Sequence, residues 1–120
     1  MTFKVLADAV DEKLAAIALL LRQVEQGSGT LDLPNLARHL MDAMRLFQRN
    51  PGIRAAADDL YTATAAIVAD STPRLQPTAR QLRLFKEAHR RFTSRLTGAA
   101  ERVGLYEYLA VPVFPLQHAA

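Results

Sequence analysis

The side chains in this sequence with the widest chemical range are its three histidines, His39, His89 and His118. His89 falls on the apolar stripe of a predicted helix. There an imidazole either accepts protons or a phosphoryl group, or is a core residue with one hydrogen-bonded nitrogen. We favour the core interpretation. We expect His39 to lie partly exposed on a helix flank and His118 to lie in a C-terminal tail.

Other patterns that support catalysis or metal binding are weak. A di-iron helical bundle needs inward glutamates and Glu-x-x-His pairs, but Glu87 and His89 are two residues apart, and His39 with Asp42 has no matching second pair. The absence of cysteine excludes thiolate metal sites and a cysteine nucleophile. We therefore predict no catalytic residues, no metal and no cofactor. A small helical enzyme or phosphotransfer domain centred on His89 is kept as an alternative.

One stretch of the first predicted helix, Ala9-Val10-Asp11-Glu12-Lys13-Leu14, resembles the opening helix of the all-helical chorismate mutases. Those enzymes bind a dianionic substrate with arginines and a lysine from several helices. The arginine expected ahead of this stretch is absent, and the nearest basic residue is Lys4. The resemblance implies helix here and gives no site residue.

Basic residues are concentrated near the C-terminal end of a chain whose net charge is +3. The segment 74–102 holds eight of the fifteen lysines and arginines and two acidic residues. Helical spacing gathers six of them on the polar face of the fourth predicted helix: Arg80, Arg83, Lys86, Arg90, Arg91 and Arg95. This face predicts an acidic protein partner. Nucleic acid is a less favoured alternative, because Phe85 and Phe92 point inward rather than lying among the arginines.

Hydrophobic periodicity predicts the elements that carry these residues. A seven-residue rhythm runs through Phe3, Ala7, Val10, Leu14, Ile17, Leu21 and Val24, and it returns at Leu82, Phe85, His89, Phe92, Leu96, Ala99 and Val103. Helices are expected over about 2–26, from a cap at Asp32 to Asn50, from Asn50 to about 70, and from a capping box of Thr78 and Gln81 to about 103. On the second helix, Asp42 can pair with Arg38 or Arg45. The third helix has an inner stripe that consists of Ile53, Ala56, Leu60, Thr64 and Ile67. The sequence therefore predicts an all-α fold, an antiparallel four-helix bundle of one domain over residues 1–110.

The C-terminal residues 111–120 are predicted to form an extended tail, because Pro112 and Pro115 interrupt any helix there. The tail is apolar, and we expect it to dock in a groove of its own bundle or on a neighbouring subunit. The residues expected to make this contact are Val111, Val113, Phe114 and Leu116.

The first predicted helix has apolar residues on a second side, and these predict self-association. They are Val5, Ala16, Leu19 and Leu20. A helix that is apolar on two sides is central in its bundle or shared between subunits. We favour a homodimer with this helix at or near the interface. The alternative is that the tail covers this side within one subunit.

Neither a membrane span nor a targeting segment is predicted. The apolar run 14–21 is too short to cross a bilayer, and Arg22 follows it. We therefore expect a cytoplasmic protein without a membrane partner. The function that these patterns favour is that of a small, non-enzymatic interaction or regulatory protein, although a helical bundle has no implied function of its own.

Overall fold

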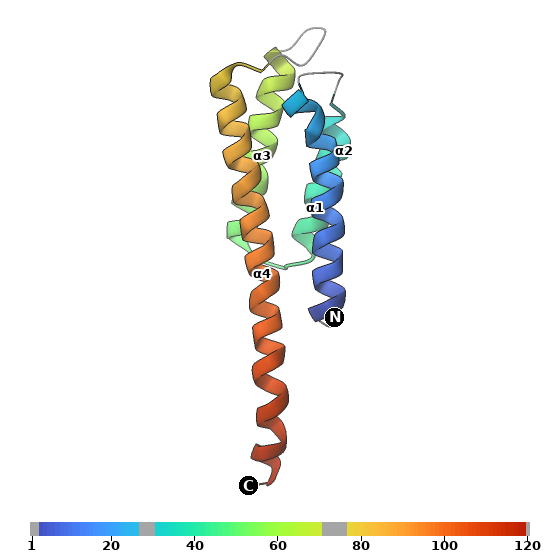
Figure 1. The fold of residues 1–120 in the computed structure, drawn as a ribbon, viewed down its shortest axis with the longest axis vertical. Helices are drawn as coiled ribbons and strands as arrows, with labels where there is room; N and C mark the ends of the chain where they lie inside the picture. The colour runs from blue at the N-terminus through green and yellow to red at the C-terminus, as the bar shows by residue number, and fades with distance from the viewer. Residues whose placement is uncertain (1–2, 27–30, 71–76, 120) are drawn as a thin grey trace.

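A computed structural model describes residues 3–26, 31–70 and 77–119 of the chain, with side chains described as far as residue 104. These residues form four α-helices: α1 (Phe3–Gln26), α2 (Leu33–Arg45), α3 (Pro51–Asp70) and α4 (Ala79–Ala119). Consecutive helices run in opposite directions, and both α1 and α3 pack between α2 and α4 (Figure 1). The prediction of an all-α antiparallel four-helix bundle is confirmed.

Side-chain caps begin α2 and α3 where the sequence predicts them. The Oδ1 atom of Asp32 accepts the main-chain N–H of Asn35 at 3.1 Å, and Oδ1 of Asn50 accepts that of Ile53 at 3.1 Å. Each bond satisfies a donor that has no partner within the helix. Pro51 then begins α3, at a position where its missing N–H costs nothing.

A capping box begins α4, as predicted from the spacing of Thr78 and Gln81. The N–H of Gln81 donates to Oγ1 of Thr78 at 3.1 Å, and the N–H of Thr78 donates to Oε1 of Gln81 at 3.0 Å. The side-chain nitrogen of Gln81 also donates to the Asp70 carboxylate at 2.6 Å. This second bond joins the start of α4 to the end of α3.

The core lies on the predicted inner faces of the helices. Its largest fully buried side chains include Phe85 and Phe92 of α4. Every residue predicted to face inward from α3 is buried: Ile53, Ala56, Leu60, Thr64 and Ile67. Removing this apolar surface from water is the main force that holds the four helices together.

The stripe of α1 differs from the prediction at its first turn. Leu6, which the seven-residue rhythm omits, is only 4% exposed, whereas Phe3 is 37% exposed. Phe3 lies at the end of the bundle, and its ring lies against Gly104 of α4. A Cβ placed at Gly104 would come within 2.6 Å of the ring. The lack of a side chain at Gly104 is what allows this contact.

Helix α2 ends at Arg45, about one turn earlier than its apolar rhythm predicts. The N–H groups of Leu46 and Phe47 bond to the carbonyls of Ala43 and Met44, each at 3.2 Å, which tightens the chain into a turn. Arg49 then has a φ of 56°, in the left-handed region that side chains other than glycine seldom occupy.

The structure differs from the predicted extended tail, because α4 continues in helical conformation through Pro112 and Pro115 to Ala119. Proline has no main-chain N–H, so the helix lacks a donor at each of these two positions. Helix α4 is thus ~61 Å long, compared with ~36 Å for α1, and it projects past the ends of the other helices (Figure 1). Its backbone therefore leads away from any groove of its own bundle.

The predicted docking contacts of Val111, Val113, Phe114 and Leu116 lie outside the side chains that the structure describes, as does the side chain of His118. The division of the chain at residue 110 stays a prediction. Within the described ranges, every helix is too short or too polar to cross a lipid bilayer.

Candidate interaction surface

The six basic residues predicted to form a face of α4 are all exposed. They are not equivalent, because α3 packs along one side of α4 and α1 along the other. Arg91 turns toward α3, where its Nη1 atom lies 3.3 Å from Oδ2 of Asp59. Arg95 is also on this side, and its Nη1 atom is 2.7 Å from the position that a Cβ at Gly52 would occupy. Arg91 is therefore paired within its own chain, and Arg95 lies against Gly52 without an ion pair among the described residues.

Three of the remaining cations, Arg83, Lys86 and Arg90, form what we call the basic ridge. They make no ion pair with any described residue. Positions 83 and 90 are two helical turns apart, ~10.5 Å along the axis, and 86 lies between them on the side toward α1. The ridge thus presents three cations without an ion pair among the described residues on a rigid helix. The exposed Glu87 lies beside them, and a partner can supply further counter-charge.

A shallow groove of about 570 Å³ continues from the ridge along α4. It is lined by Glu25 at the end of α1 and by eight residues of α4: Lys86, His89, Arg90, Thr93, Ser94, Thr97, Gly98 and Glu101. Lys86 and Arg90 lie at one end of the groove and Glu101 lies at the other, with the hydroxyl groups of the serine and threonines between them. The rise along the axis of α4 from residue 86 to residue 101 is ~22 Å. The small residues in the middle leave room for another polypeptide to approach.

His89 lines this groove and is half-buried, so its predicted place wholly within the core is corrected. Its ring lies 6.3 Å from the ring of Phe85, centroid to centroid. No hydrogen bond joins it to another residue of the described part of the chain, in contrast to the bond expected for a core histidine. Burial lowers the pKa of His89, and the carboxylate of Glu25 opposes this. The imidazole is therefore neutral at pH 7 and acts as one wall of the groove.

The structure adds little support for catalysis or metal binding by the other residues considered. His39 is partly exposed, as expected, but its Nδ1 atom is buried and has no hydrogen-bond partner among the described residues, a feature the sequence does not reveal. Among the residues that the structure describes, no three histidine, aspartate or glutamate side chains lie close enough together to hold a metal ion.

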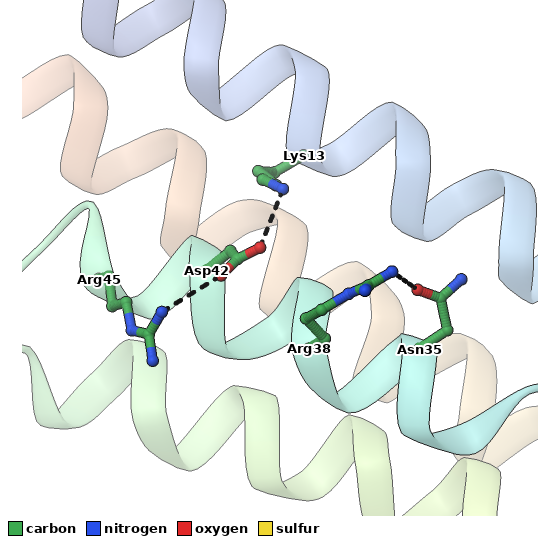
Figure 2. A network of polar contacts seen from close by, with 5 residues as sticks. All are labelled: Lys13, Asn35, Arg38, Asp42 and Arg45. Carbon is green, nitrogen blue, oxygen red and sulfur yellow. Dashed lines mark hydrogen bonds and ion pairs between the residues drawn. The ribbon is translucent and has the colours of Figure 1, made fainter.

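The polar contact between α1 and α2 was also not predicted from the sequence. Lys13 of α1 donates to the carboxylate of Asp42 on α2, and Arg45 lies on the other side of the same carboxylate (Figure 2). Of the two pairs that helical spacing allows for Asp42, the pair with Arg45 is present, with 3.5 Å between Nη1 and Oδ1. Arg38 instead donates to the side chain of Asn35. The pair with Lys13 was missed because its members are far apart in the chain.

The predicted self-association residues are not one continuous surface. Val5 and Leu19 are 55% and 63% exposed, but Ala16 and Leu20 are half-buried, and Leu20 packs against the core. The two exposed side chains are ~21 Å apart along α1, since fourteen residues separate them. Leu19 is thus the main apolar side chain that this face leaves open to water.

Comparison of the chain with protein-family models, with curated proteins and with solved structures finds no significant match. The chain is therefore described by its architecture and surface. It is a small antiparallel four-helix bundle with an exposed basic ridge and an adjoining polar groove on its longest helix.

Proposed function

We propose that this protein is a small, non-enzymatic interaction protein whose basic ridge binds an acidic segment of another protein. The observation that carries the proposal is that Arg83, Lys86 and Arg90 are exposed on one rigid helix without ion-pair partners among the described residues. Carboxylates of a partner helix would face these cations, and its backbone would lie along the groove beside Thr93 and Ser94.

Two features favour an acidic polypeptide over nucleic acid. The ridge spans only ~10.5 Å, which is short for following a phosphate backbone. The aromatic residues closest in sequence, Phe85 and Phe92, are fully buried and are not available to stack on bases.

The test measures binding of a helix-forming peptide with glutamates at i and i+4 positions, by fluorescence anisotropy, against the same peptide with glutamine. Reversal of the ridge (Arg83→Glu, Lys86→Glu and Arg90→Glu together) should weaken binding about tenfold or more, since each exposed pair contributes up to about 1 kcal/mol. The matched control changes three exposed arginines elsewhere to glutamate, namely Arg22, Arg38 and Arg102.

Both variants have the same net charge, so they separate a defined ridge from general attraction. Equal loss of binding in the two variants, or equal binding of the glutamine peptide, would contradict the proposal. Binding of a DNA duplex that is tighter than that of the peptide, with log K falling against log salt at a slope of about −2.7 for three phosphate contacts, would favour the nucleic-acid alternative.

We also propose that the protein forms a homodimer, with α1 at or near the interface. The exposure of Leu19 and the projection of α4 beyond the bundle support it (Figure 1). Sedimentation velocity at micromolar concentration should give a dimer, and Leu19→Asp should give a monomer of unchanged helicity. Leu84→Asp, at another exposed leucine, is the control and should remain dimeric. A wild-type monomer would contradict this proposal and would leave the ridge proposal unaffected.

A further inference from the structure

A second concentration of positive charge lies at the turn between α2 and α3, well away from the basic ridge (Figure 1). The segment 43–57 contains three arginines, and Asp42 and Asp58 flank it: these arginines are Arg45, Arg49 and Arg54. Two adjoining pockets of about 390 and 380 Å³ lie here, and both are lined by Met44, Arg49 and Arg54. Both are open to solvent, so a ligand bound here would keep part of its surface in water.

The two arginines shared by the pockets differ from Arg45 in their ion pairs. Arg45 has the carboxylate of Asp42 at 3.5 Å (Figure 2). Arg49 and Arg54 make no ion pair with any residue that the structure describes. The N-terminus of α3 adds the partial positive charge of a helix start at the same place. The surroundings of the pocket therefore favour an anion.

The backbone of Arg49 is a second and independent feature of the turn. Its φ of 56° is strained for any residue with a Cβ, and glycine would adopt this conformation without strain. This conformation belongs to the turn that leads from α2 to α3, and Arg49 is one of the two cations without an ion pair that line both pockets.

The other pocket walls indicate what kind of anion fits. Met44 and Phe47 are half-buried apolar side chains that pack against the core and line the larger pocket. Asn50 lines it too, and because its Oδ1 caps α3, the amide nitrogen is the atom of that side chain left to donate. Guanidinium forks match the oxygens of phosphate, and the apolar wall suits a carbon skeleton attached to it.

We infer that Arg49 and Arg54 bind the phosphate group of a small organic phosphate monoester, whose apolar part lies against Met44 and Phe47. This site is separate from the basic ridge, and it requires neither the acidic partner nor the dimer. The ligand is held by charge-assisted hydrogen bonds at one end and by buried apolar surface at the other, as in small-molecule sites generally.

The experiment is a calorimetric titration of the full chain with phenyl phosphate. We expect phenyl phosphate to bind more tightly than inorganic phosphate, which lacks the apolar part, and benzyl alcohol, which lacks the charge, not to bind. Arg49→Gln and Arg54→Gln should each weaken binding about tenfold, as expected for loss of a hydrogen bond to a charged group. Arg38→Gln, at an exposed arginine on another side of α2, is the matched control and should bind as the wild type does.

Arg49→Gly separates binding from folding. It removes the guanidinium and relieves the strained φ, so its midpoint of thermal unfolding should rise while binding of phenyl phosphate is lost. Unchanged binding by this variant, or equal weakening by Arg38→Gln, would overturn the site. Equal affinity for inorganic and phenyl phosphate would overturn its assignment to an organic phosphate. Binding of a phosphorylated peptide but not of phenyl phosphate would overturn the small-molecule assignment.

Discussion

The ammonium group of Lys13 on α1 lies 3.2 Å from Oδ2 of Asp42 on α2 and joins these two helices by an ion pair (Figure 2). The hydrogen bond from Lys13 is the main reason that the pKa of Asp42 is lowered, and the positive charges of Lys13 and Arg45 act in the same direction against a smaller effect of burial. The carboxylate is thus held in its charged form.

The first prediction concerns pH. Because the pKa of Asp42 is lower in the folded than in the unfolded chain, its contribution to stability is complete above the unfolded pKa. The contribution is lost as pH falls through the folded value, where the carboxyl group is protonated in both states. Asp42→Asn should therefore make the chain slightly less stable at pH 7 and should reduce the loss of stability between pH 7 and acid.

Urea unfolding at a series of pH values measures this effect. Asp58→Asn, at an exposed aspartate without an ion pair among the described residues, is the control and should keep the wild-type pH dependence. If Asp42→Asn and Asp58→Asn gave the same curves, the pair with Lys13 would have no measurable role.

The second prediction contrasts two large side chains of α4. Phe92 is fully buried, whereas Leu84 is 46% exposed. Phe92→Ala should lower the free energy of unfolding by about 3–5 kcal/mol, because it removes apolar contacts and leaves a cavity. Leu84→Ala should change it by less than about 0.5 kcal/mol. Urea denaturation monitored by circular dichroism tests both, and a similar cost for the two would contradict the assigned core face.

The third prediction uses two glycines within α4. No heavy atom outside the helix lies within 4 Å of a Cβ placed at Gly98, so Gly98→Ala should stabilise the protein by about 1 kcal/mol through helix propensity. At Gly104 the added methyl group would meet the Phe3 ring at 2.6 Å. Gly104→Ala should therefore gain less than Gly98→Ala, or lose stability. Phe3→Ala combined with Gly104→Ala should restore the gain from helix propensity if the ring is the cause.

The fourth prediction concerns the capping box of α4. Thr78→Ala should cost about 1 kcal/mol, because the N–H of Gln81 loses its acceptor. Gln81→Glu would keep the box, but it would place a carboxylate against that of Asp70 in place of the present hydrogen bond. This variant should be less stable than the wild type at pH 7, and the difference should shrink at acid pH. A pH-independent difference would show that repulsion from Asp70 is not the cause.

The sequence by itself determined the helix starts and the inner faces. Caps such as Asp32 and Asn50 act on residues three positions away, and an apolar rhythm repeats within a few residues, so both can be read locally. For this reason the inner stripe of α3 and the exposure of all six basic residues of α4 were predicted correctly.

Tertiary structure alone decided which of those basic residues remain without partners. The pairs Arg91–Asp59 and Lys13–Asp42 join residues about thirty positions apart, and such contacts depend on how whole helices are placed. The same holds for the groove beside His89. At the C-terminal end, the presence of Pro112 and Pro115 predicts an extended chain, whereas helix α4 continues through both residues. Local propensity describes what a residue prefers, and the helical backbone at Pro112 and Pro115 differs from that preference.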